Sequence, residues 1–239
     1  MASFSRHSLQ LLSLGAPPDL LERVHQASLD EVRHARLSYS LASRYLGREV
    51  GPGRLDVRDS LGDLAPATIL GSVVAEGCVG ETVAAVEARL AHRLARDTEV
   101  AGVLATIATD EAKHAELAWA AVVWMLSPSA PSVEAPNEPD AGLSGAGLVS
   151  RAAVAASFKG LLATGAVQRY RADATQARMR AEGILTPADH AAVRAVVLQR
   201  VVAPALDAML TGRPARIAER IAGLPLDSVL EPGKPAPVN

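Results

Sequence analysis

The sequence predicts an all-α protein in which a four-helix bundle is followed by additional C-terminal helices. Two features of the 239 residues predict this fold class. Hydrophobic residues make up 49% of the chain but aromatic residues only 3%, so the apolar side chains are mainly Ala, Leu and Val, which favour closely packed helices over sheets. In addition, long stretches with helical periodicity alternate with breaks rich in Pro and Gly.

Four long helices are expected in the first half of the chain, and Pro and Gly mark several of their ends. These helices cover residues 2–14, 18–46, 66–95 and 97–126. Gly15 ends the first helix, Pro18 starts the second and Pro66 starts the third. Asp97 or Thr98 caps the fourth. The links inside each pair are short and the link between the pairs is long, which fits a four-helix bundle with one crossover.

The second half of the chain begins with a break in periodicity. The predicted division is a bundle over 1–126, a Pro-, Ser- and Gly-rich linker over 127–147, and a helical extension over 148–239. Within the extension, a helical pattern runs from about Leu148 to Met179. A later helix has Thr186 as its N-cap, and Pro204 is expected to kink that helix.

Charge, cysteine count and hydropathy narrow the function classes. The formal net charge of −2 lacks the basic excess of a nucleic-acid-binding protein. Cys78 is the only cysteine, so neither an internal disulfide nor a cysteine-based metal cage is expected. No uninterrupted apolar run of membrane-spanning length is expected, and the N-terminal residues are too polar for a signal peptide. A cytoplasmic protein without a nucleic-acid or membrane partner is therefore expected.

The motif DExxH occurs twice, each time near the middle of a predicted long helix. DEVRHA occupies residues 30–35 and DEAKHA occupies residues 110–115. Because positions i and i+3 share a helix face, the Glu and His of each copy point the same way. Burying such a pair costs several kcal/mol unless something compensates, and a metal ion is one way to do so. For a single copy, a surface Glu–His pair is the alternative. The repeated motif predicts four metal ligands: Glu31, His34, Glu111 and His114.

The Asp that precedes each Glu has a separate expected role. A metal-bound His normally donates its second ring N–H to a carboxylate. Asp30 and Asp110 lie about 100° round the helix from the adjacent Glu, so each can reach toward the other helix. We expect Asp30 to accept from His114, and Asp110 to accept from His34. Outer salt bridges are expected for two neighbouring cations, Arg33 and Lys113.

The third helix should add a carboxylate, and the segment VVAEGCVGETVAA offers Glu76 and Glu81. These residues are five positions apart, or about 140° on an α-helix, so at most one is expected to be a primary ligand. Gly77 and Gly80 each cost about 1 kcal/mol relative to Ala inside a helix, which suggests a packing or site reason near Glu76. Glu76 is favoured as the ligand and Glu81 as a neighbouring or substrate-side carboxylate, and both remain candidates.

The first helix lacks the carboxylate that a symmetrical centre needs. The first acidic residue of the chain is Asp19, which already belongs to the second helix. Mirroring Glu31 through the turn near Ala16 puts the required position at about residue 1 or just before it. His7 lies a turn or more too near the hairpin. It is therefore a weaker candidate ligand, and otherwise a surface or interface residue.

These motifs resemble a family of bacterial ferritin-like domain proteins, within the wider di-iron carboxylate superfamily. The resemblance covers roughly residues 2–126 and rests on ASFSRHSLQLLSLGAPPDL, LDEVRHARLSYSLAS, VVAEGCVGETVAA and IATDEAKHAELAW. It implies two bound iron ions, with manganese or a mixed Mn/Fe pair as alternatives. Relatives carry a Glu-His-Ala-Ser stretch shortly before the segment that matches Ala2–Phe4. The resemblance thus implies that this chain begins inside the first helix, lacks one ligand and loads metal weakly or partially.

The function implied by the resemblance is that of an oxidoreductase whose di-metal centre activates O₂. The substrate would be a small organic molecule or Fe(II), and an electron-donor protein and a homodimer are further expected partners. One alternative is an iron-handling ferroxidase without an organic substrate, for which a large shell of chains is expected. Another is a non-catalytic helical protein that has lost its metal centre.

Overall fold

The computed structural model describes residues 2–128, 147–162, 174–226 and 229, and within these ranges every regular element is a helix. The predicted all-α fold class is therefore confirmed for the described residues. Their helical elements are α1 (Ala2–Ser13), α2 (Pro18–Leu46), α3 (Pro66–Ser72), η1 (Val73–Glu81), α4 (Thr82–Leu94), α5 (Thr98–Leu126), α6 (Arg151–Lys159), α7 (Ala174–Ala181), α8 (Pro187–Val197), η2 (Leu198–Val202), α9 (Ala203–Leu210) and α10 (Ile217–Ala222). The elements η1 and η2 are π-helical.

The chain forms two compact units that interleave along the sequence. The first unit consists of residues 1–74 and 117–157, and the second of residues 75–116 and 158–239. The sequence predicts consecutive segments instead, divided at residues 126 and 147, and that division stays a prediction. Most of the expected linker lies outside the described residues.

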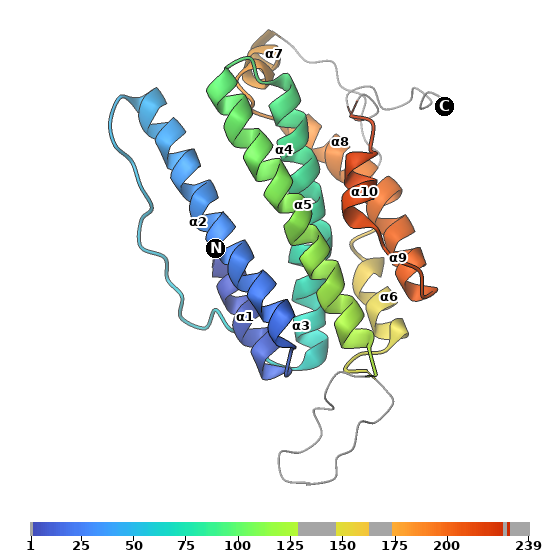
Figure 1. Cartoon of the computed structure of the whole chain (residues 1–239). Helices are drawn as coiled ribbons and strands as arrows, with labels where there is room; N and C mark the ends of the chain where they lie inside the picture. Colours follow the sequence, from blue (N-terminus) through green and yellow to red (C-terminus); the bar gives the residue numbers. More distant parts are fainter. Residues whose placement is uncertain (1, 129–146, 163–173, 227–228, 230–239) are drawn as a thin grey trace. The chain divides into compact units, whose positions relative to one another are not determined.

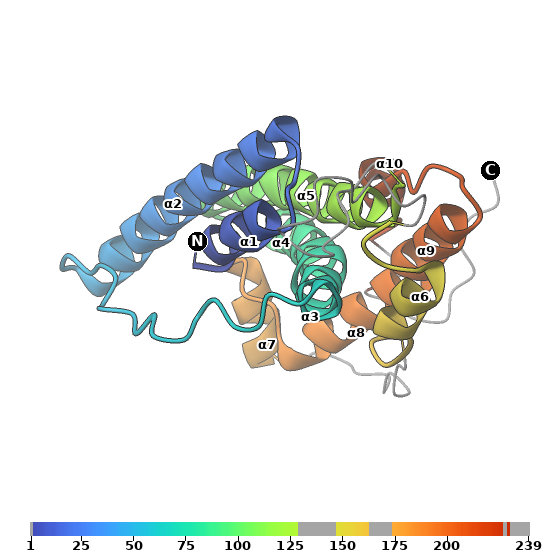
Figure 2. The same ribbon diagram turned by 90° about the horizontal axis from the view of Figure 1, so that it is seen from below.

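In the first unit, α1 and the first half of α2 pack together as a helical hairpin (Figures 1 and 2). Gly15 makes the turn with a φ of 72°, a conformation that glycine adopts without steric cost. Pro18 then begins α2, where no backbone N–H is needed. Leu11 and Val24 are almost fully buried in this unit. The predicted bounds of the first two helices are met to within one residue.

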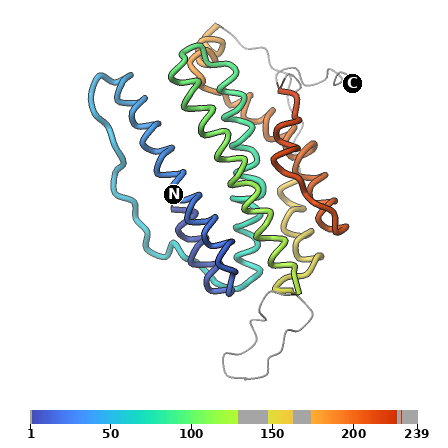
Figure 3. The backbone as a smooth tube through the Cα atoms, viewed as in Figure 1, coloured from blue at the N-terminus to red at the C-terminus, as the bar shows by residue number. Residues whose placement is uncertain are grey.

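The second half of α2 extends beyond α1 (Figure 1). The 29 residues of α2 compare with 12 in α1, and the last buried residue of α2 is His34. From Ala35 to Leu46 every side chain is half-buried or exposed. Gly47 ends the helix in the left-handed conformation, with a φ of 64°. Figure 3 traces how the following residues, 48–65, return from this end to the start of α3.

From Pro66 to Leu94 the chain is helical without a break, although η1 replaces the predicted α-helix over nine residues. The hydrogen bonds of a π-helix join residues i and i+5, so each turn holds one residue more than a turn of α-helix. This run is long and apolar enough to cross a membrane by length and composition, and 56% of its most apolar window is buried inside the protein. The buried core helix of a soluble protein passes the same test. The expected absence of a membrane partner stays a prediction.

Asp97 caps α5, as the sequence predicts. Its carboxylate accepts the backbone N–H of Glu99 at 2.8 Å and that of Val100 at 3.2 Å. The helix then continues for 29 residues to the predicted end at Leu126. Residues up to Glu116 belong to the second unit, and the remainder belongs to the first.

In the second unit, α8, η2 and α9 form one run of helix (Figure 2). The predicted N-cap Thr186 is confirmed: its hydroxyl accepts from the backbone of Asp189, whose carboxylate accepts from the backbone of Thr186. Arg180 of α7 forms an ion pair with the same carboxylate. The π-helical turn η2 ends at Val202, two residues before Pro204, the residue at which a kink is predicted. Because Pro has no N–H to donate, a wider turn accommodates it.

The remaining helices show both a difference from the prediction and an unexpected element. The helical pattern predicted over 148–179 forms two helices, α6 and α7, and residues 163–173 between them lie outside the described part of the chain. The short helix α10 is not predicted from the sequence. It contacts α4, whose Arg89 donates to the carbonyl oxygens of Ile221 and Leu224 and so satisfies backbone acceptors around the end of α10.

Candidate metal centre

The first DExxH copy lies where the buried residues of α2 end. The Nδ1 atom of His34 lies 3.2 Å from a carboxylate oxygen of Glu31, one helical turn earlier. The side chain of His34 is buried, whereas 24% of the Glu31 side chain is exposed. The two groups therefore face one another on one side of the helix, as their spacing predicts.

Asp30 is buried on a neighbouring face of α2. One of its carboxylate oxygens accepts hydrogen bonds from Gln26 and Arg33, both at 3.1 Å. The salt bridge predicted for Arg33 is thus confirmed. Gln26 is a partner that the sequence analysis missed, although its i, i+4 spacing to Asp30 indicates it. Acceptance by Asp30 from His114 stays a prediction.

The second copy, on α5, repeats the local arrangement with deeper burial. The Nδ1 atom of His114 lies 3.2 Å from a carboxylate oxygen of Glu111, and Lys113 donates to Asp110 at 3.1 Å. Only 9% of the Glu111 side chain and 2% of the His114 side chain are exposed. Lys113 remains largely in solvent, as predicted for an outer salt bridge. Acceptance by Asp110 from His34 stays a prediction.

Burial makes these two motifs energetically demanding. Five of their ionisable side chains are buried: Asp30, His34, Asp110, Glu111 and His114. The penalty for an uncompensated buried ion is several kcal/mol even after the surroundings relax. Arg33 and Lys113 offset the charge of the two Asp carboxylates. A cation bound between the Glu and His donor atoms would offset the charge of the Glu carboxylates.

The spacing inside each Glu–His pair suits two ligands of one metal ion. Metal distances to carboxylate oxygen and imidazole nitrogen are roughly 2.0–2.2 Å. Donor atoms that lie 3.2 Å apart, as in both pairs, then subtend an angle of about 100° at the ion. Imidazole suits iron and zinc, and carboxylate suits manganese. The carboxylate oxygens and imidazole nitrogens of these pairs therefore fit iron or manganese, and they fit zinc as well.

The two motifs lie in different units. Glu31 and His34 belong to the first unit, and Glu111 and His114 belong to the second. Each unit therefore presents one Glu–His pair whose two donor atoms lie 3.2 Å apart. That these four side chains and Glu76 or Glu81 hold a shared metal centre stays a prediction.

No family model, curated protein or solved structure matches this chain. The resemblance to ferritin-like proteins therefore rests on the residues of the motifs themselves. The all-helical architecture and the two Glu–His pairs stand on the structure alone. Which metal binds, which reaction takes place and which bundle family the fold belongs to are therefore matters of proposal.

Glu76 and Glu81 both lie on η1, and its π-helical conformation changes their relation. The angle of about 140° that separates them holds for an α-helix. In a π-helix, residues i and i+5 lie about one turn apart and share a face. The argument from the sequence that at most one of Glu76 and Glu81 is a primary ligand therefore does not hold for η1. Glu76 is exposed and Glu81 is half-buried. Their role as metal ligands stays a prediction.

Two further residues singled out from the sequence are buried. His7 of α1 is 8% exposed, so it is not a surface residue, and its Nδ1 lies 3.0 Å from the carbonyl oxygen of Ser3. Cys78 of η1 is fully buried, and this burial raises the pKa of its thiol well above the usual value. Cys78 is therefore a small residue of the core.

Proposed function

We propose that this chain is a ferritin-like metalloprotein in which the DExxH motifs of α2 and α5 hold an iron-containing centre for oxidation–reduction with O₂. The observation that carries the proposal is the Glu–His pair in each motif, whose two donor atoms lie 3.2 Å apart. An ExxH pair on each of two helices is the pattern of di-iron and di-manganese carboxylate bundles.

In this proposal the first metal ion binds Glu31, Glu111 and His114. A second ion would take its ligands from the remaining candidates, which are His34, Glu76 and Glu81. Mixed carboxylate and imidazole ligation is compatible with either iron or manganese. A bound di-iron centre would supply the capacity to exchange electrons with O₂.

Two Asp carboxylates are held in place beside the proposed ligands. Asp30 accepts hydrogen bonds from Gln26 and Arg33, and Asp110 accepts from Lys113. Carboxylates next to metal ligands commonly orient the imidazoles that bind the metal.

The proposal is tested by an anaerobic Fe(II) titration, followed by calorimetry, of the wild type and three variants: Glu31→Gln, Glu111→Gln and His114→Ala. Each variant removes one donor atom, so each is expected to weaken binding of the tightest ion by about ten-fold or more. The matched control is Glu116→Gln, an exposed carboxylate on α5 outside the motif, which should bind as the wild type does.

Unchanged affinity in the three ligand variants, or an equal loss in the control, would refute the metal centre. The redox part is tested separately by O₂ uptake of the Fe(II)-loaded wild type. Tight Fe(II) binding without O₂ consumption would reject the oxidoreductase and leave an iron-binding protein.

A further inference from the structure

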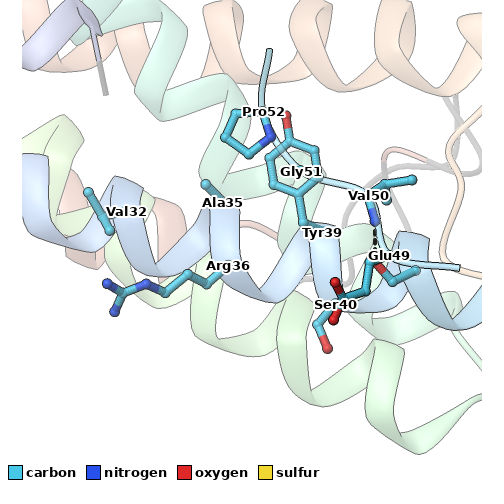
Figure 4. A pocket seen from close by; sticks show the side chains of 10 residues that line it. Val32, Ala35, Arg36, Tyr39, Ser40, Glu49, Val50, Gly51 and Pro52 are labelled. Carbon is cyan, nitrogen blue, oxygen red and sulfur yellow. Dashed lines mark hydrogen bonds between the residues drawn. The ribbon is translucent and has the colours of Figure 1, made fainter. Parts of the chain in front are cut away.

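A pocket of about 670 Å³ lies between the second half of α2 and the chain segment that follows this helix (Figure 4). This volume falls within the usual range for small-molecule sites. All of the residues that line it belong to the first unit: Val32, Ala35, Arg36, Tyr39, Ser40, Ser43, Glu49, Val50, Gly51 and Pro52. None of them is a predicted metal ligand.

The α2 side of the pocket is a single helix face. Its residues from Val32 to Ser43 follow the i, i+3, i+4, i+7 spacing, and they extend along the helix for about 16 Å. The facing wall is tied to this helix because the backbone N–H of Val50 donates to the hydroxyl of Ser43 at 3.0 Å. The pocket is therefore elongated and has a wall that is held by a hydrogen bond.

The centre of the pocket is apolar and aromatic. Figure 4 shows Tyr39 projecting from α2 on the side of Gly51 and Pro52. Tyr39 is half-buried. An apolar ligand body would cover the ring and the Pro52 side chain and so remove both from water.

The lining of the pocket carries one cation, Arg36, and one carboxylate, Glu49. Arg36 is the cation that lines the pocket, and Figure 4 shows its side chain running along α2 toward Val32. In the described part of the chain, the Arg36 guanidinium has no ion-pair partner. Guanidinium groups bind carboxylates through two parallel hydrogen bonds.

We propose that this pocket binds a small organic carboxylate, whose charged group pairs with Arg36 and whose apolar body lies against Tyr39 and Pro52. A cationic group is disfavoured at the Arg36 end of the pocket because like charges repel. The site does not depend on the proposed metal centre, so binding is measured on the full chain in the presence of a chelator. If no carboxylate binds, the metal proposal is unaffected. If no metal binds, the carboxylate proposal is unaffected.

The test is calorimetric titration with octanoate, phenylacetate and octanol. The wild type is expected to bind at least one of the two carboxylates with a Kd below about 1 mM. It should bind octanol, which has the same body as octanoate without the charge, more weakly. Arg36→Gln is expected to weaken carboxylate binding by about ten-fold and leave octanol binding unchanged, because only the charge-assisted hydrogen bonds are lost. Tyr39→Ala should weaken binding of all three probes.

The matched control is Arg23→Gln, which removes an exposed arginine from the same helix outside the pocket and should leave binding unchanged. Arg36 and Arg23 are both exposed, so both variants should fold, and their unfolding midpoints verify this. Absence of saturable binding of both carboxylates would overturn the proposal. Equal effects of Arg36→Gln and Arg23→Gln would also overturn it, because they would indicate non-specific charge attraction.

Discussion

Adjacent carboxylates in the DExxH motifs have different local partners because they lie on different helix faces. Glu31 and Glu111 each face a His at 3.2 Å, whereas Asp30 and Asp110 each accept from a cation at 3.1 Å. The i, i+3 rule predicts each of these contacts from the sequence. The deeper burial of the second copy is not predictable in this way, since it depends on tertiary packing.

Asp189 is a residue whose contribution to stability depends on pH. Burial tends to raise the pKa of its carboxyl, but hydrogen bonds from Arg180 and Thr186 outweigh this effect and leave the pKa below its usual value. We expect Asp189→Asn to reduce the free energy of unfolding by about 1–2 kcal/mol at pH 7, because it weakens the capping box and the ion pair. Urea unfolding measures this difference.

The pH dependence has a defined sign. Because the folded pKa lies below the unfolded value of about 3.9, the stabilisation is complete above pH 4 and is lost as the pH falls through the folded pKa. The gap between the wild type and Asp189→Asn should therefore close below that value. The control Asp207→Asn, at an exposed ion pair with Arg213, should change stability by less than about 0.5 kcal/mol. A gap that persists unchanged at low pH would contradict this account.

At the scale of single elements, α2 shows how well Pro and Gly in the sequence predict the bounds of a helix. Pro18 and Gly47 fix both of its ends, and the predicted range of 18–46 is the observed one. The conformation of η1 was not predictable, since a π-helix carries no separate periodicity that the apolar pattern reveals. The π-helical conformation matters for the candidate metal centre, because it determines whether Glu76 and Glu81 share a face of η1.

The second half of α2 is expected to open more easily than the first. No side chain from Ala35 to Leu46 is buried, so little tertiary packing supports these turns. In native-state hydrogen exchange, amides of residues 39–46 should lose protection before those of residues 22–34. The corresponding amides of α5, residues 102–114, serve as the reference helix. Equal protection along the whole of α2 would contradict this prediction.

At the scale of the whole molecule, the proposed centre links metal binding to folding. The proposed ligands come from two helices, with Glu31 on α2 and both Glu111 and His114 on α5, so only the folded chain can present them together. Fe(II) at about 100 times its Kd should then raise the free energy of unfolding by about 2.7 kcal/mol. Anaerobic urea unfolding with and without metal measures the change. No shift, or an equal shift in Glu111→Gln, would contradict the linkage.

The sequence predicts much of the helical pattern, and it predicts the candidate ligands because both depend on local spacing. The predicted linker falls mostly on residues outside the described part. The pocket beside α2 was not predicted, since it depends on where the segment around Val50 returns to the helix. Long connections without periodicity carry no signal for such a placement.

The most direct test of the central claim is a crystal of the protein grown with Fe(II) or Mn(II) and measured at the absorption edge of the metal. An anomalous difference peak bonded to Glu31, Glu111 and His114 is the result predicted here. The absence of a peak at these side chains in crystals that contain the metal, or a peak held only by other residues, would contradict the claim.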